Sequence, residues 1–495
     1  MFVLGETLHN IKLLAPEVCL TLFLCLLFVV DGILPKMRTN RFSMITTVVG
    51  CLAALVLTCK VGQTPEAYFG GMVVNDGLTK FFRYFFYFTA AVSCYLAFGS
   101  NEIEKQSRME FSLLLLCTTI GMGIMATASN LLVLYMGIEM VSIISFVMAG
   151  FKRDNLRSNE ASFKYLVFGG VASGLMIYGF SLMYGLTGSL NYPQIAAYLT
   201  STQGNLGLVF WLALVLIYGG LAYKISAFPM HFWAPDVYEG APTPVATFFS
   251  VGPKAAGFAA FIRIFLTVFS VKTAEGNWQM INGISLAHVI AIISALTMLV
   301  GNLSAIGQTN VKRILAFSSI AHVGYMLMGL VTLDRSGLTA IIFYLIAYCA
   351  MNLGAFWVVS VVSNIRGRED LDAFRGLGWS MPVLGTCMAV FIFSLTGIPM
   401  FSGFIGKFLI FGSVIKSGGF LWLALLGVLN SVVSLYYYVK ILKSMWLDKP
   451  ESQESLSLSF YHAVGLVGLA IPTIVLGLYF TPILEFAERT LSNIL

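Results

Sequence analysis

The sequence predicts an all-α polytopic membrane protein with about fourteen transmembrane helices. Of its 495 residues, 58% are hydrophobic and 11% are charged, whereas ordinary globular domains carry about 25% charged residues. The apolar residues gather in fourteen runs of the length that a membrane-spanning helix needs. These runs do not alternate as the short strands of a transmembrane β-barrel do, so we expect every spanning element to be a helix.

The fourteen runs, numbered segments 1 to 14 in chain order, are joined by short loops. The first run is long and no basic stretch precedes it, so we expect a spanning helix there and not a cleaved signal. The approximate cores are 16–34, 42–60, 78–99, 111–128, 131–150, 162–186, 207–230, 243–270, 284–305, 314–332, 338–363, 382–410, 417–445 and 459–482.

Segments 7 and 12 each contain a proline inside a run of membrane length. Pro229 comes five residues after Lys224, and Pro399 comes eight residues before Lys407. Proline has no backbone N–H and clashes with the preceding turn, so both helices are expected to break. A break inside the membrane is tolerated only where protein or water satisfies the freed groups. Paired interruptions of this kind indicate repeats around a mid-membrane pathway.

The two interrupted segments are five apart, which predicts two five-helix repeats, helices 4–8 and 9–13. Because five is odd, the second repeat is expected to run inverted. Glu139 precedes Lys224 by 85 residues and His322 precedes Lys407 by 85, although the two lysines lie on opposite sides of their prolines, so coincidence remains an alternative. The predicted units are 1–110 (three helices), 111–275 (first repeat), 276–445 (second repeat) and 446–495 (C-terminal helix).

The loop lysines and arginines predict the orientation. If the N-terminus lies outside, sixteen of these residues fall in cytoplasmic loops and six in outside loops. An even number of helices then places both termini outside.

Five charged side chains lie inside the apolar segments. A charge in the bilayer interior costs about 2.5–3.5 kcal/mol on insertion scales, so several of them together indicate a function. Burial readily lowers the pKa of a lysine in general, and a nearby carboxylate raises it, so buried lysines are suited to proton exchange. The five residues are Glu139, Lys164, Lys224, Lys254 and Lys407.

Each of these residues also has a plainer interpretation. Glu139 could form a structural ion pair, and Lys164 could extend to the cytoplasmic surface from one turn inside segment 6. Lys407 could be a surface anchor. We favour proton transfer for all five, with Lys164 as the partner or relay of Glu139 and with Lys224 hydrated beside the first break.

Other polar residues carry weaker signals. His322 lies well inside segment 10, where a lone histidine is usually structural. Histidine titrates near neutrality, however, and we predict that His322 takes part in proton translocation as a relay. Asp31, Arg83 and Arg263 lie towards helix ends, and we expect them to extend to the interfaces.

The sequence predicts no metal or cofactor site. His231, Asp236 and Glu239 follow the first break, but their spacing matches no standard ligand motif. The eight cysteines fall in apolar runs, without a CxxC or Cys/His cluster, and are expected to be free thiols. The chain has no ATP-binding loop, dinucleotide fingerprint or haem or iron–sulfur pattern, and no basic block for nucleic acid. The energy for transport is therefore expected from a partner or from another ion gradient.

Several long motifs resemble the antiporter-like proton-channel family. Its members are the large membrane-arm subunits of respiratory complex I and related multisubunit cation/proton antiporters. The resemblance extends over about residues 110–440, and the wording of 232–245 is most similar to one type of bacterial complex I subunit. The motifs are Lys224–Pro244, Gly252–Ala256, Gly301–Leu303, Val311–Ile320, Gly397–Pro399 and Gly406–Lys407.

The resemblance implies a fourteen-helix subunit of the bacterial inner membrane, bound to other membrane subunits, including neighbouring antiporter-like ones. Both termini would then be periplasmic. It implies that Glu139, Lys164, Lys224, Lys254 and Lys407 carry protons. Flavin, iron–sulfur clusters and the quinone site would belong to partner subunits.

Three alternatives stay open at this point. The chain could belong to a sodium/proton antiporter, although a sodium site favours carboxylates and carbonyls and here lysines predominate. It could be a structural scaffold, or part of a plastoquinone-using relative of complex I.

Overall fold

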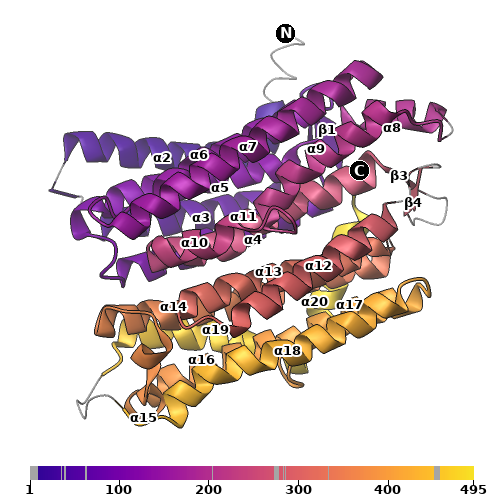
Figure 1. The fold of residues 1–495 in the computed structure, drawn as a ribbon. Coiled ribbons are helices and arrows are strands. Elements are labelled where there is room, and N and C mark those ends of the chain that lie inside the picture. Colours follow the sequence, from indigo (N-terminus) through magenta and orange to yellow (C-terminus); the bar gives the residue numbers. More distant parts are fainter. Residues whose placement is uncertain are drawn as a thin grey trace.

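The computed structural model describes residues 9–34, 36–37, 41–61, 64–202, 204–272, 278–281, 284, 286–332, 334–450 and 457–494. Within these ranges, thirteen helices are long and apolar enough to cross a membrane. Figure 1 shows them running roughly side by side. They are α2 (Ala15–Ile33), α3 (Phe42–Lys60), α4 (Gly77–Phe98), α5 (Arg108–Thr127), α6 (Leu131–Ala149), α7 (Leu156–Thr187), α9 (Leu208–Ile225), α11 (Thr243–Thr267), α12 (Ala287–Ile306), α13 (Val311–Val331), α14 (Arg335–Arg366), α18 (Leu421–Trp446) and α19 (Phe460–Leu478).

The predicted all-helical membrane fold is confirmed, and both predicted breaks are present. Segment 7 forms α9 and then, after the break, the short helix α10 (Trp233–Gly240). Segment 12 forms α16 (Pro382–Thr396) and α17 (Ser402–Lys416), each of 15 residues. Ser226 and Gly397 end the first helix of each pair in the left-handed conformation, with φ of 61° and 91°.

The innermost helices are α11, α13 and α14. All residues in the most apolar stretches of α11 and α13 are buried, whereas only 22%, 33% and 22% are buried in those of α2, α7 and α19. In Figure 1 the helices from α2 to α11 form one half of the molecule and those from α12 to α19 the other. Lys254 on α11 and His322 on α13 therefore lie near the boundary between the halves.

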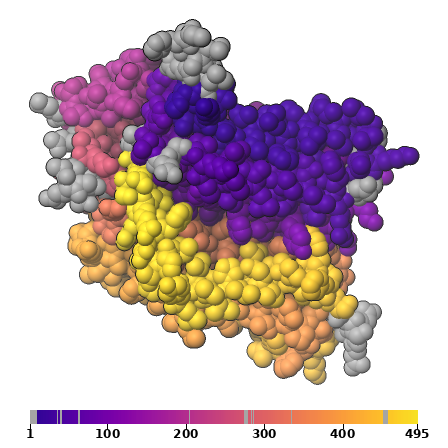
Figure 2. Space-filling view, turned by 180° about the vertical axis from the view of Figure 1, so that it is seen from behind, coloured from indigo at the N-terminus to yellow at the C-terminus, as the bar shows by residue number. Residues whose placement is uncertain are grey.

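The sequence did not predict the short elements that connect the spanning helices. Figure 2 shows the C-terminal residues, which include α19 and α20, lying across one face of the molecule. There α20 packs against α4 and α14. The short elements are β1 (Glu66–Tyr68) paired antiparallel with β2 (Val73–Asn75), β3 (Ser270–Lys272) paired antiparallel with β4 (Trp278–Met280), η2 (Lys105–Ser107), α8 (Tyr192–Ser201), η3 (Leu371–Phe374), α15 (Leu377–Ser380) and α20 (Thr481–Ser492).

Two buried arginines are not extended to an interface, contrary to the expectation for Arg83 and Arg263. Arg83 donates from Nε and Nη2 to the two carboxylate oxygens of Glu17, at 2.7 and 2.8 Å. Arg263 donates from Nη1 and Nη2 to the two oxygens of Asp76, both at 2.9 Å. The paired forks satisfy charge and geometry inside the protein, so these arginines connect α4 to α2 and α11 to the start of α4.

We expect Arg83→Met to destabilise the fold by about 3–5 kcal/mol, because it leaves the Glu17 carboxylate buried without its partner. The double variant Glu17→Leu/Arg83→Met removes both charges and should recover part of the loss. The fraction that stays monodisperse in detergent after heating measures this. Equal heat stability of the single variant and the unmodified chain would contradict the prediction.

Candidate functional site

Lys224 lies in the last turn of α9, directly before the first break, and is 2% exposed. Its Nζ donates to Ser142 Oγ on α6 at 3.0 Å. Glu139 lies one turn before Ser142, and its buried Oε1 has no hydrogen-bond partner among the described residues. Glu139 and Ser142 therefore lie on the same side of α6. The Ser142 hydroxyl joins this side of α6 to Lys224 on α9.

The backbone groups freed by the first break are satisfied by protein. Trp233 Nε1 on α10 donates to the carbonyl oxygen of Tyr223 at 3.0 Å. Phe228 N donates to Thr297 Oγ1 on α12 at 3.0 Å. The break therefore holds its shape without leaving unpaired backbone groups at these positions.

Lys254 lies on α11 directly after Pro253, a proline inside the helix. Pro253 cannot donate to the carbonyl of Phe249, and Tyr238 Oη on α10 donates to that carbonyl instead, at 3.1 Å. The ring of Tyr238 also lies 5.4 Å from Lys254 Nζ, within the range of a cation–π contact. Tyr238 thus replaces the missing backbone hydrogen bond of α11 and contacts the ammonium group of Lys254.

The end of α9, which carries Lys224, packs against α11 at Gly257, one turn after Lys254. A Cβ atom at Gly257 would lie 2.5 Å from a methyl carbon of Ile225 and 3.5 Å from Lys224 Cγ. The missing side chain therefore allows the end of α9 to pack directly on α11.

One face of α13 connects Lys254 to the second half of the molecule. Lys254 Nζ donates to Ser319 Oγ at 2.5 Å. One turn further on, His322 is completely enclosed, with Nδ1 2.6 Å from Tyr344 Oη and Nε2 3.2 Å from Tyr438 Oη. In a neutral imidazole one nitrogen donates and the other accepts, so His322 can connect the two hydroxyls.

Lys407 completes the series on α17. Its Nζ lies 4.6 Å from the centroid of the Tyr325 ring, and Tyr325 is one turn after His322. The same ammonium donates to the carbonyl oxygens of Leu395 and Thr396, at 3.0 and 2.9 Å, and to Ser431 Oγ at 3.0 Å. Lys407 therefore caps the C-terminal end of α16, where a positive charge is favourable.

Gly403 allows the second break to close. Its backbone N donates to Ser394 Oγ at 3.0 Å. A Cβ atom at Gly403 would lie 1.9 Å from the carbonyl oxygen of Ser394, far inside contact distance. The start of α17 can approach the end of α16 only because this residue has no side chain.

Lys164 has a different environment from the other four residues. It is 37% exposed at the side chain and pairs with Glu160 and with Asp236 on α10, both at 2.7 Å. Arg313 on α13 pairs with Asp236 at 2.7 Å and with Glu239 at 2.8 Å. The partner expected for Lys164 was Glu139, whereas the structure joins Lys164 to α10. Asp236 and Glu239, considered above as metal ligands, hold cations of the protein itself.

The structure therefore brings Lys254, His322 and Lys407 together along α13 and places Lys224 against α11 beside them. Ser142 was noted on a turn near Glu139, but its bond to Lys224 was not predicted. Sequence reasoning missed the hydroxyl groups of Ser319, Tyr344 and Tyr438. The sequence signal for these was the position of Ser319 one turn before His322.

Comparison with known proteins identifies the family. Residues 128–434 match the family model described as "NADH:quinone oxidoreductase/Mrp antiporter, TM". The chain belongs to this family. The resemblance that the motifs predicted is confirmed, and the matched region includes all six candidate residues, from Glu139 to Lys407.

Members of the family match the chain almost from end to end. NADH-quinone oxidoreductase subunit N 2 of Sorangium cellulosum is 42% identical over 98% of this chain and 99% of its own length. Subunit N of Chlorobium chlorochromatii is 40% identical over 96% and 94%.

Two solved structures share the fold. A chain of respiratory complex I from Thermus thermophilus superposes with a TM-score of 0.78 at 30% identity, over 95% of this chain and 98% of that one. A chain of the Mrp complex from Dietzia sp. has a TM-score of 0.83 over 97% of both chains, at 20% identity. The latter likeness concerns the fold alone.

We expect Gly403→Ala to destabilise the second break by about 1–3 kcal/mol or more, the usual cost of overpacking, because its Cβ would overlap the Ser394 carbonyl. Gly412→Ala is a matched control on the same helix, since no atom lies within 4 Å of the added Cβ. Thermal stability of the purified subunit in detergent measures both. A Gly403→Ala protein as stable as the Gly412→Ala protein would contradict the close approach.

Proposed function

We propose that this chain is the subunit N type of membrane-arm subunit in a proton-pumping NADH–quinone oxidoreductase. In this proposal it carries protons through Glu139, Lys224, Lys254, His322 and Lys407. The observation that supports it is the contact series along α13, in which Ser319 binds Lys254, His322 lies between two tyrosine hydroxyls, and Tyr325 faces Lys407.

The free energy of a pKa shift at a buried lysine is comparable to the work of moving a proton across the membrane. A pKa shift of one unit corresponds to about 1.4 kcal/mol, and moving one charge across 100 mV costs about 2.3 kcal/mol. Shifts of a few units, which buried groups commonly undergo, therefore suffice for pumping. Small movements of the helix breaks would change the hydration and partners of Lys224 and Lys407.

The driving reaction would take place in other subunits. Relatives at 38–42% identity are named as subunits of NADH-quinone oxidoreductase, and we infer that flavin, iron–sulfur clusters and quinone are bound by the partners. The chain would lie beside other membrane subunits, including antiporter-like ones, within the lipid bilayer. Lys164 would hold α10 through Asp236 while protons pass along the neighbouring helices.

We also propose the two inverted repeats, 111–275 and 276–445, and periplasmic termini. Two contacts that correspond in position support the repeats. Ser142, three residues after Glu139, binds Lys224, and Tyr325, three residues after His322, contacts Lys407. The excess of lysine and arginine in the cytoplasmic loops supports the orientation.

The test replaces Lys224 or Lys254 with Met in the assembled complex, reconstituted into vesicles. We expect each variant to lower the proton-to-electron ratio during quinone reduction, because Met cannot accept a proton. Lys416→Met is the control, since Lys416 is an exposed lysine at the outer end of α17.

An unchanged ratio in both variants would exclude proton transfer through these residues and favour a scaffold. The same measurement in Na⁺-free and Na⁺-containing buffer tests the cation-antiporter alternative. Pumping that requires Na⁺ would contradict a proton-only pathway.

A further inference from the structure

The last spanning helix, α19, lies directly against the linker of the second break. A Cβ atom at Gly477, near the end of α19, would lie 2.2 Å from the carbonyl oxygen of Met400 and 2.5 Å from the carbonyl carbon of Phe401. Met400 and Phe401 belong to the linker between α16 and α17. Both contacts are to backbone atoms, which cannot swing away as the end of a side chain can. The backbone of α19 therefore reaches the linker only because residue 477 has no side chain.

The linker has a conformation that its own residues do not favour. Met400 has a φ of 79°, in the left-handed region that suits glycine and is strained for other residues. Its side chain is 66% exposed, so packing of that side chain does little to hold the backbone. Phe401, the last residue before α17, provides no side-chain cap for that helix. A strained conformation persists only where the surrounding structure fixes it, and Gly477 packs on the carbonyl group of the strained residue.

The start of α19 is fixed to α4 and to α14. The rings of Tyr461 and of Tyr95 on α4 stack with their centroids 4.1 Å apart, and Tyr461 Oη donates to the Tyr95 carbonyl oxygen. Trp357 Nε1 on α14 donates to His462 Nδ1 at 3.2 Å. A Cβ atom at Gly465 would lie 2.2 Å from the Trp357 ring, so α19 packs closely on α14. The first turns of α19 thus have a fixed position relative to both halves of the molecule.

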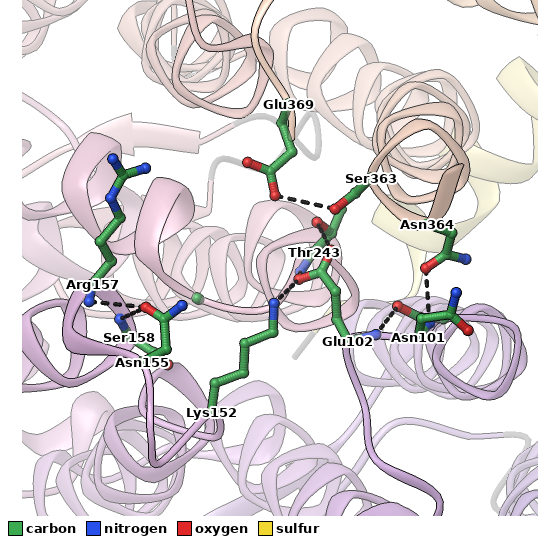
Figure 3. Close-up of polar contacts among 12 residues, drawn as sticks. Asn101, Glu102, Lys152, Asn155, Arg157, Ser158, Thr243, Ser363, Asn364 and Glu369 are labelled. Carbon is green, nitrogen blue, oxygen red and sulfur yellow. Dashed lines mark hydrogen bonds and ion pairs between the residues drawn. The ribbon is translucent and has the colours of Figure 1, made fainter. Parts of the chain in front are cut away.

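The two helices that anchor α19 are also joined to each other. Figure 3 shows Asn364, in the last turn of α14, beside Asn101, which follows α4. Asn101 N donates to Asn364 Oδ1 at 2.8 Å, and Asn364 Nδ2 donates to the carbonyl oxygen of Gly99 at 2.9 Å. A Cβ atom at Gly99 would lie 2.5 Å from His462 Cε1, so this junction borders the start of α19. Helices α4 and α14 therefore form one base for α19.

The two fixed points of α19 lie far apart along the helix. Tyr461 and Gly477 are sixteen residues apart, which is about 24 Å at 1.5 Å per residue. Over this length α19 packs against α14, α16 and α17, so it contacts both parts of the broken helix. Gly403 and Lys407, in the first two turns of α17, both bind the end of α16. The position of the linker therefore determines how α17 approaches α16.

We propose that Gly477 is a positioning residue for Lys407 and that α19 is a brace between the base formed by α4 and α14 and the second break, an inference that rests on the proposed pumping function. Gly477 supports the carbonyl group of Met400. Met400 and Phe401 fix the start of α17, and α17 places the Lys407 ammonium group against the end of α16. Displacing α19 from the linker would move Lys407 away from its carbonyl acceptors on α16.

A role in stability alone is the plainer interpretation of a close glycine contact in a membrane protein. Small residues commonly allow two membrane helices to pack closely together, and Gly465 does this for α19 and α14. Gly477 differs because it meets a non-helical linker, at a residue whose backbone conformation needs support. A role in helix packing does not account for that contact.

The test is Gly477→Ala in the assembled complex, reconstituted into vesicles. Because the added Cβ overlaps two backbone atoms of the linker, we expect the proton-to-electron ratio during quinone reduction to fall to that of Lys407→Met. The double variant Gly477→Ala/Lys407→Met should show no further fall, because both changes act on the same group. Gly468→Ala is the matched control on the same helix and should keep the ratio, since no atom lies within 4 Å of the added Cβ.

A second variant applies if Gly477→Ala does not assemble. Tyr461→Phe/His462→Leu adds little volume and removes the hydrogen bonds that hold the start of α19. We expect a smaller fall of the proton-to-electron ratio, because the contact at Gly477 remains while its support is weakened. An unchanged ratio in this assembled variant would overturn the brace.

The outcomes separate this inference from the proposed function. A normal ratio in Lys407→Met would overturn proton transfer through Lys407, and the role of Gly477 with it. A lowered ratio in Lys407→Met together with a normal ratio in Gly477→Ala would overturn the positioning role alone, even if Gly477→Ala lowers heat stability. Additive losses in the double variant would show that Gly477 does not act through Lys407 and would also overturn the positioning role.

Discussion

The structure depends on one constraint, which is that a break in a membrane helix must find partners for its freed backbone groups inside the protein. Three contacts meet this constraint beside the candidate residues. Trp233 satisfies the end of α9, Tyr238 satisfies the carbonyl freed by Pro253, and Lys407 satisfies the end of α16. The interruptions that make polar groups available at membrane depth thus also fix where those groups lie.

Helix α13 connects the two halves of the molecule because it presents polar groups to both. Ser319 faces Lys254 of the first half, and Tyr325 faces Lys407 of the second, with His322 between them. Near the start of α13, Arg313 holds α10 through Asp236 and Glu239. A displacement of α13 would therefore affect the break region of the first half and the lysine of the second together.

The sequence predicted the spanning helices and the breaks at Pro229 and Pro399, because these follow from local properties, namely apolar length and the missing N–H of proline. It also predicted the buried charged residues, since a charge in an apolar run is evident from the sequence. It did not predict the partners. Ser142 and Lys224 are 82 residues apart, and Arg263 and Asp76 are 187 apart, and such pairs form only when the helices pack.

The short helices and strands have no long apolar run in the sequence that would predict them. The helices α8 and α20 are short, and the strands of the two hairpins have three residues each. Apolar runs of membrane length therefore do not predict them. Lys164 was placed correctly on its helix, but its partner depends on how α10 folds back after the break. The break was predictable, whereas the direction of the chain after it was not.

The three acceptors around Lys407 have a consequence for the second break. An ammonium group has three N–H bonds, and here Leu395, Thr396 and Ser431 receive one each. A neutral amine has only two, so whenever Lys407 gives up its proton, one of these acceptors loses its donor. The end of α16 is thus held by the same proton that the site would pass on. The conformation of the second helix break therefore depends on whether Lys407 is protonated.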